Sequence, residues 1–190
     1  MLTRRTQDGI AVLAFVTTML VLTASVCAAA MHFLHAGRQL AGLQLDREIA
    51  FRAAEAALLD AEADLLAAAA SPHARLASWP DPGHCGVEAQ RAICRTGTGQ
   101  PAWWPWIEGS PPESVPALSI GAFTGARLPD LPEGVAGATH PPRYLIEVLD
   151  HHQTLQTLAG TAQWPRFRIT ALGLARDPSV RVLLQTEFQP

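Results

Sequence analysis

Two cysteines that lie close together in the sequence, Cys85 and Cys94, are the residues best placed to do chemistry. With the neighbouring His84 they could bind zinc, but their spacing fits no common zinc motif. A disulfide is the better prediction, because this segment is expected outside the cytoplasm for the reasons given below, and disulfides persist there. Closing a loop of about ten residues would stabilise the fold by roughly 2–3 kcal/mol in the chain-entropy model. The third cysteine, Cys27, falls in an apolar segment and is expected to act as a small apolar residue.

Seven histidines and several carboxylates raise the question of a metal or catalytic site. The densest group is His151 and His152 after Asp150, but neighbours on a strand point to opposite faces and histidines at a turn usually face solvent. Glu55 and Glu62 could be paired carboxylates on one side of a helix, yet we expect them to meet arginines of neighbouring molecules, or water. The sequence contains no HExxH or GxSxG motif. We therefore predict no enzyme, no metal site and no cofactor.

The charged residues exclude further functions. All 14 basic residues are arginine, so a Walker A lysine, a Schiff-base lysine and a lysine general base are absent. The net charge of −3 and the scattered arginines lack the basic patch expected of a nucleic-acid-binding protein. Only 16% of the residues are charged while 48% are hydrophobic, which indicates that apolar residues are concentrated in one part of the chain.

That apolar part is the run Ile10–Leu34, which contains no charged residue. As a helix it would rise about 37 Å, enough to cross a hydrocarbon core of about 30 Å. Arg4 and Arg5 precede it, so the positive-inside rule places the N-terminus in the cytoplasm and residues 35–190 outside. The alternative is a cleaved signal peptide with its site around residues 27–30. A retained anchor is favoured, because the run is longer than a usual signal-peptide core and continues unbroken into a second helical segment.

The second segment, residues 37–70, is rich in Ala, Leu, Glu and Arg and should end at Ser71-Pro72. Glu48 and Arg52 form a favourable i,i+4 pair. Apolar residues recur at helical spacing and predict one stripe that faces a core, formed by Phe51, Ala54, Leu58, Ala61 and Leu65.

The rest of the chain predicts loops followed by strands. Most of the 15 prolines lie between Ser71 and Pro142, with one or two short strands expected around residues 117–123. Trp79, Trp103, Trp104 and Trp106 fall in this region and are expected to pin the loops to the domain. Alternating apolar residues then predict strands at Arg143–Asp150, Arg166–Leu174 and Ser179–Phe188, the last two joined as a hairpin through residues 175–178. We predict an α+β fold in which the long N-terminal helix packs on a C-terminal antiparallel sheet.

Two segments resemble a known family. Gln7-Asp8-Gly9 before the uncharged run resembles the class III leader of type IV pilins and pseudopilins. The run from Asp46 to Glu62 is similar to the DRxxAFxAAEAALxxAE signature of PilX-type minor pilins, and the matched positions include Asp46, Arg47, Ala50, Phe51, Ala54, Glu55, Leu58 and Glu62. The resemblance implies cleavage after Gly9 by the prepilin peptidase and N-methylation of Ile10. It also implies a leader at 1–9, a transmembrane helix at 10–34, a periplasmic continuation at 35–70 and a periplasmic pilin-like head at 71–190.

One departure from the family pattern concerns Ala14, which stands where type IV pilins usually carry Glu as the fifth mature residue. In the family that Glu is thought to neutralise the N-terminal amine of the neighbouring subunit, since an unpaired charge is costly in an apolar filament core. PilX-type pilins and the K pseudopilins of type II secretion commonly lack it. Ala14 therefore favours a subunit that initiates the filament and ends at its tip.

The resemblance implies a minor pilin of a type IV pilus, belonging to a priming or tip complex. Its expected partners are other minor pilins, the major pilin, the prepilin peptidase, the inner-membrane assembly platform, membrane lipid and, as an option left open, a tip adhesin. The protein would be a single-pass inner-membrane protein before it reaches the pilus tip at the cell surface. One alternative is a minor pseudopilin of a type II secretion system, although K pseudopilins usually carry a large inserted domain for which residues 71–190 leave little room. The other is an anchored envelope enzyme.

Overall fold

The structure, a computed structural model, describes residues 4–71, 75–76, 78–130, 135, 137–149 and 165–190. It divides into two compact units, Met1–Leu45 and Asp46–Pro190, and the second is called the C-terminal unit below. Helix α1 (Arg4–Ala70) begins in the first unit and ends in the second. Among the described residues it is long and apolar enough to cross a membrane. The large apolar side chains from Ile10 to Leu45 are exposed, so nothing within the first unit covers them.

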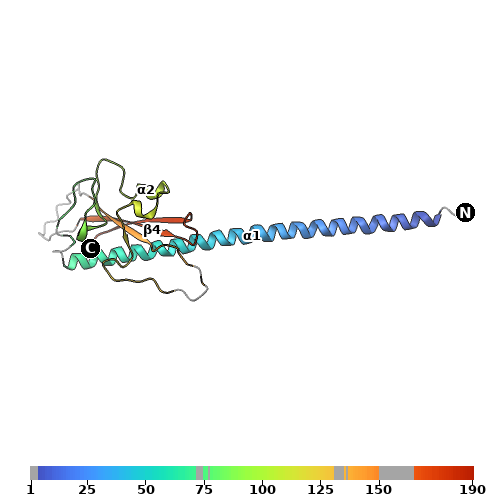
Figure 1. The fold of residues 1–190 in the computed structure, drawn as a ribbon, viewed down its shortest axis with the longest axis horizontal. Helices are drawn as coiled ribbons and strands as arrows, with labels where there is room; N and C mark the ends of the chain where they lie inside the picture. The colour runs from blue at the N-terminus through green and yellow to red at the C-terminus, as the bar shows by residue number, and fades with distance from the viewer. Residues whose placement is uncertain (1–3, 72–74, 77, 131–134, 136, 150–164) are drawn as a thin grey trace, which may run out of the picture. The chain divides into compact units, whose positions relative to one another are not determined.

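The C-terminal unit contains the second part of α1 and all the strands (Figure 1). Loops that include the short helix α2 (Trp104–Ile107) and two 3₁₀ turns, η1 (Glu88–Gln90) and η2 (Pro112–Ser114), precede most of the sheet. The strands are β1 (Ile93–Arg95), β2 (Leu118–Ser119), β3 (Arg143–Leu149), β4 (Arg166–Leu174) and β5 (Arg181–Phe188).

The strands form one sheet in the order β1-β3-β4-β5, with β2 paired to β3. The pairs β3/β4 and β4/β5 are antiparallel, with Ile146 opposite Ile169 and Ile169 opposite Thr186. This arrangement confirms the predicted α+β class, the three long strands and the hairpin. β1 was not predicted, and it runs parallel to β3, so the sheet is mixed. β2 is shorter than the strand expected at residues 117–123, because the chain turns at Gly121, whose φ is +77°.

Helix α1 covers one face of this sheet, as Figure 1 shows for the part next to β4. The buried positions of the helix are mostly alanines, namely Ala50, Ala53, Ala54, Ala57, Ala61 and Ala68, together with Leu65. Ala57, Ala61, Leu65 and Ala68 pack on the core that includes Ile146, Phe167 and Ile169. Most of the predicted stripe is confirmed: Ala54, Ala61 and Leu65 are buried and Leu58 is half-buried against the core, whereas Phe51 is only half-buried. Small side chains occupy the centre of the contact because they let the helix lie close to the sheet.

The backbones of α1 and β4 approach each other closely at Gly173. A Cβ atom on Gly173 would lie 2.0 Å from the carbonyl oxygen of Ala50 and 2.6 Å from the amide nitrogen of Ala54. Both are backbone atoms of α1, so no side-chain rotation could make room. Glycine at this position lets the backbones of helix and strand touch.

Candidate assembly helix and its contacts

The N-terminal part of α1 presents the residues expected to direct processing and assembly. Ile10 and Ala14 are exposed on a continuous helix. The hydroxyls of Thr17, Thr18 and Ser25 donate hydrogen bonds to main-chain carbonyls three residues earlier, at 2.8–2.9 Å. Because these bonds satisfy the polar side chains within the helix, the surface of this segment can face lipid or other apolar helices. Cleavage after Gly9 and methylation of Ile10 stay predictions.

The first matched motif residue, Asp46, makes a contact within the same chain. Its carboxylate accepts a hydrogen bond at 2.6 Å from Nε of Arg176, which lies in the turn between β4 and β5. Arg47, the next motif residue, is exposed. This ion pair therefore connects the turn between β4 and β5 to the start of the part of α1 that packs on the sheet.

The other motif residues are likewise arranged around the helix–sheet contact. Ala50 and Ala54 are fully buried against Gly173. Glu55 pairs with Arg52 of its own chain at 3.0 Å, and its predicted contact with arginines of neighbouring molecules or with water stays a prediction. The predicted pair of Arg52 with Glu48 is confirmed at 2.8 Å. Glu62 is half-buried on the same helix.

A buried polar network that sequence reasoning missed lies between the helix, the loops and the sheet. Asp64 of α1 pairs with Arg75 at 2.9 Å, and the side chains are only 3% and 7% exposed. The hydroxyl of Tyr144, on β3, donates to the same carboxylate at 3.0 Å. Burial raises the pKa of Asp64, and the charge of Arg75 and the hydrogen bond from Tyr144 offset this in part. Burial likewise lowers the pKa of Arg75 and raises that of Tyr144.

The same network extends one helical turn back to Asp60. The Asp60 carboxylate accepts hydrogen bonds from the main-chain N–H of Gly121, at 2.7 Å, and from the hydroxyl of Thr124. The guanidinium of Arg75 lies 3.7 Å from the ring centroid of Phe123 and donates to the carbonyl of Ala89 at 2.7 Å. Asp60 and Asp64, on the buried face of α1, thus bind the loops that contain Gly121 and Arg75. The spacing of these two aspartates, one helical turn apart among apolar positions, could have indicated a buried polar network from the sequence.

Trp79, Trp103 and Trp106 pin the loop region to the core, as predicted, whereas Trp104 bonds within its own loop. Trp106 is 1% exposed, and its indole N–H donates to the carbonyl of Pro112 at 3.2 Å. Trp79 packs on Phe167 with ring centroids 5.9 Å apart. Trp104 is half-buried and donates to Glu108 at 2.8 Å.

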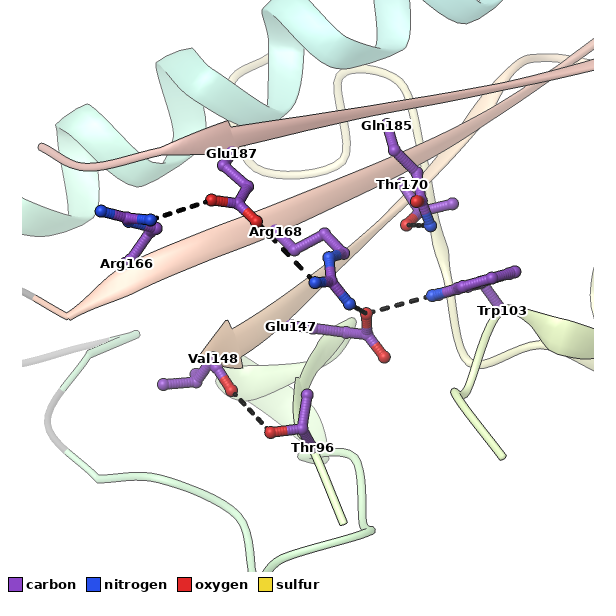
Figure 2. A network of polar contacts seen from close by, with 9 residues as sticks. All are labelled: Thr96, Trp103, Glu147, Val148, Arg166, Arg168, Thr170, Gln185 and Glu187. Atoms are coloured by element: carbon purple, nitrogen blue, oxygen red, sulfur yellow. Dashed lines mark hydrogen bonds and ion pairs between the residues drawn. The ribbon is translucent and has the colours of Figure 1, made fainter. Parts of the chain in front are cut away.

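Trp103 contacts a second polar cluster, on the sheet (Figure 2). Its indole N–H donates to Oε2 of Glu147 at 3.1 Å, and Nη1 of Arg168 lies 3.9 Å from the same oxygen. Arg168 also lies 3.8 Å from Glu187, which pairs with Arg166 at 3.2 Å. Glu147 is 2% exposed, and burial raises its pKa above the usual range despite these partners. Its neighbours Tyr144 and Ile146 belong to the core.

Cys85 and Cys94 form a disulfide in the structure, with Cα atoms 3.9 Å apart. Cys94 lies on β1 opposite Glu147 of β3, and the main-chain N–H of Gly86 donates to the carbonyl of Ile93 at 2.8 Å. The bridge therefore fixes the short parallel strand that joins the sheet. Cys27 is a free, exposed cysteine on α1.

We predict that replacing Cys85 and Cys94 together with serine lowers the free energy of unfolding of the C-terminal unit by roughly 2–3 kcal/mol, because a loop of about ten residues is no longer closed in the unfolded chain. Urea titration of the full chain in detergent micelles, followed by tryptophan fluorescence, measures this loss. Reduction of the native protein should reproduce it, and the Cys27→Ser variant is the matched control. An unchanged midpoint in the double variant would contradict the prediction.

A metal site finds no support in the part of the chain that the structure describes, where no group of three or more His, Cys, Asp or Glu side chains converges. His84 contacts the carbonyl of Pro82 at 3.3 Å. Asp150, His151 and His152 lie outside the described residues.

Comparison with known proteins adds one match. A family model described as "Type IV pilus assembly protein PilX C-term" matches residues 66–190. These residues include the loops, the disulfide and every strand. No curated protein sequence and no solved structure matches the chain.

Proposed function

Because the chain belongs to the PilX family of type IV pilus assembly proteins and is a minor pilin, we propose that it acts in the complex that primes pilus assembly and remains at the pilus tip. The observation that carries this proposal is the family match over residues 66–190, which begins inside α1 and extends through the sheet. Family members are structural components of the pilus, so the function is assembly with other pilus components.

The exposed apolar half of α1 supports insertion in the inner membrane. We propose a leader at residues 1–9, a transmembrane helix at 10–34, a periplasmic continuation at 35–70 and a periplasmic head at 71–190. The side chains from Ile10 to Leu45 lie on the surface of their unit, where lipid or the helices of other pilins would cover them. Arg4 and Arg5 favour a cytoplasmic N-terminus.

The tip position is proposed from Ala14. A subunit within the filament is expected to supply a carboxylate for the amine of its neighbour, because an unpaired charge in apolar surroundings is costly. Alanine supplies none, and it is exposed on the helix. A subunit that begins the filament would not need this carboxylate. Other minor pilins, the major pilin and the assembly platform are the proposed partners.

Processing provides the direct test of this proposal. We predict that the mature protein begins at Ile10 with an N-methylated amine, as mass spectrometry of the purified protein would establish. A Gly9→Val variant should remain as an unprocessed precursor in the inner membrane, because a Cβ-branched side chain blocks close approach of a protease to the backbone. Gly37→Val, on the same helix, is the control and should be processed normally. A mature N-terminus near Ala30 would refute the pilin assignment of this segment.

A deletion strain tests the role in assembly. Loss or sharp reduction of surface pili is expected, with recovery on complementation. Unchanged pili together with lost protein export would instead assign the chain to a type II secretion system.

A further inference from the structure

The two edges of the sheet differ, and the edge at β1 is covered within the chain. Residues 83–86 lie on the far side of β1, where the main-chain N–H of Gly83 donates to the carbonyl of Arg95 at 2.9 Å. The Cys85–Cys94 disulfide joins the same two segments. Strand β1 thus has main-chain partners on both sides, β3 on one and residues 83–86 on the other. The loop that the disulfide closes therefore ends the sheet at this edge.

The other edge of the sheet is strand β5. It pairs with β4 along its whole length, from Arg181 opposite Leu174 to Phe188 opposite Phe167. Within the residues that the structure describes, no main-chain hydrogen bond joins residues 181–188 to any segment other than β4. Main-chain N–H and C=O groups at an edge strand point alternately toward the sheet and away from it, so β5 presents a row of donors and acceptors to its surroundings.

The sequence of β5 lacks the features that usually protect such an edge. Natural edge strands are short, or carry lysine, proline, a bulge or inward-pointing charges. Residues 182–186 contain no charge, proline or glycine, and the continuous pairing with β4 contains no bulge. The two charged residues of the strand, Arg181 and Glu187, flank this segment. The middle of β5 is therefore suited to pairing with a further strand.

The side chains along β5 define which strand could pair with it. Val182 lies opposite Gly173, the residue of β4 that touches the backbone of α1. Because side chains two residues apart share a face, Val182 and Leu184 both lie on the face of the sheet that the helix covers. Both are half-buried. Apolar side chains of an added strand would pack beside them and remove further apolar surface from water.

The charges at the two ends of this segment differ in their partners. The guanidinium of Arg181 donates to the main-chain carbonyl of Ser110 at 3.0 Å, and no carboxylate within the described ranges pairs with it. Glu187, in contrast, lies 3.2 Å from Arg166 and 3.8 Å from Arg168, as Figure 2 shows. An acidic residue opposite Arg181 would therefore gain a favourable cross-strand pair, whereas a basic residue there would be repelled.

We propose that β5 binds an extended segment of a partner protein as an additional antiparallel strand, with apolar side chains opposite Val182 and Leu184 and a carboxylate opposite Arg181. A second copy of this chain fits less well, because the carboxylate that its own β5 would bring to Arg181 is that of Glu187, which is already paired with Arg166. The inference goes beyond the role in pilus priming and does not depend on it, because the purified chain should bind an isolated strand.

The probe is the fluorescein-labelled peptide Thr-Val-Thr-Ile-Thr-Val-Glu, which in antiparallel register places Ile opposite Leu184 and Glu opposite Arg181. Two forms are compared, one N-methylated at its three threonines and the other at its valines and isoleucine. Successive N–H groups of a strand point to opposite sides, so only one form can pair with β5. By fluorescence anisotropy with the full chain in detergent micelles, that form should bind with a Kd of about 1 mM or lower, and the other at least tenfold more weakly. The two forms are equally apolar, so each controls for partition into the micelle.

Amide hydrogen exchange, followed by NMR, locates the bound peptide. In the free chain, the amides of alternate residues within 182–187 should exchange at least tenfold faster than those between them, because they point away from β4. The binding form of the peptide should slow these amides at least tenfold and leave the amides of β3 unchanged. Slow exchange of every β5 amide in the free chain would show that the edge is already covered, by a second copy or by the chain itself, and would overturn the proposal.

A charge comparison tests the chemistry assigned to the partner. Arg181→Gln should weaken binding of the glutamate peptide about two- to fivefold, the usual effect of an exposed ion pair, and should not change binding of a peptide that ends in glutamine. Arg166→Gln is the matched control, since it removes an exposed arginine from β4, and it should bind both peptides like the native chain.

The comparison of methylated peptides uses the native chain, so the test does not depend on the folding of a variant. Equal binding of the two methylated forms, or no binding by either, would overturn the proposal. A preference for glutamate over glutamine that survives Arg181→Gln would also overturn it.

Discussion

Replacement of Asp64 with asparagine is expected to lower the free energy of unfolding of the C-terminal unit by about 3–5 kcal/mol, the usual cost of removing one partner of a buried ion pair. The variant leaves the guanidinium of Arg75 buried, 7% exposed, without its counter-charge. Arginine cannot escape this penalty by releasing its proton. The hydroxyl of Tyr144 also loses a charged acceptor. The midpoint of urea unfolding of the full chain in micelles, followed by tryptophan fluorescence, measures the effect.

Two comparisons make this prediction specific. Arg52→Gln breaks two ion pairs, with Glu48 and Glu55, on the exposed side of the same helix and should cost less than about 1 kcal/mol. The double variant Asp64→Leu/Arg75→Met removes both charges and should recover much of the loss, because apolar residues of similar size often replace a buried ion pair at little cost. If Asp64→Asn unfolds at the native midpoint, the network contributes nothing and the interpretation is wrong.

The larger part of the fold follows from local patterns in the sequence. Strands β3, β4 and β5 alternate apolar and polar residues, and the turn between β4 and β5 contains Asp177 and Pro178, which favour turns. Helix α1 follows from a long stretch of strong helix formers that stops before Pro72. Each of these signals depends only on residues near in sequence.

The parts that could not be predicted depend on contacts between distant residues. β1 is only three residues long, too short for a local pattern to predict it. Its extended conformation depends on the disulfide between Cys94 and Cys85 and on pairing with β3. Asp64 meets Arg75 and Tyr144 through loops whose path no local pattern determines. The alanines at the centre of the helix contact are explained only by Gly173, on a strand far along the chain.

The family motif takes on a different meaning in the structure. Asp46, Ala50 and Ala54 contact Arg176 or Gly173, which belong to β4 or the turn after it. These motif positions therefore stabilise the packing of helix on sheet within one molecule. The apolar side chains of α1 before Asp46 are exposed, so they are free for the contacts with other subunits that we propose.

Gly173→Val is expected to lower the free energy of unfolding of the C-terminal unit by about 3 kcal/mol or more, at or above the upper end of the usual cost of overpacking a core. The Cβ atom of valine alone would lie 2.0 Å from the carbonyl oxygen of Ala50. The atoms that this Cβ meets belong to the helix backbone. The helix must move away from β4, which exposes the buried Ala50 and Ala54 and disturbs the contact of Ala57 with the core. Urea unfolding of the full chain measures the loss.

The direction of this effect distinguishes packing from strand propensity. Valine favours strands over glycine by up to about 1 kcal/mol, and Gly173 has no positive φ that valine would resist, so propensity alone predicts a more stable protein. Gly173→Ala should already be destabilised, by about 1–3 kcal/mol, since the clash begins at the Cβ. Gly99→Ala, where a Cβ meets no atom within 4 Å, should unfold near the native midpoint. Native or higher stability of Gly173→Ala would mean that helix and sheet are not in backbone contact, and the role assigned to Ala50 and Ala54 would fail with it.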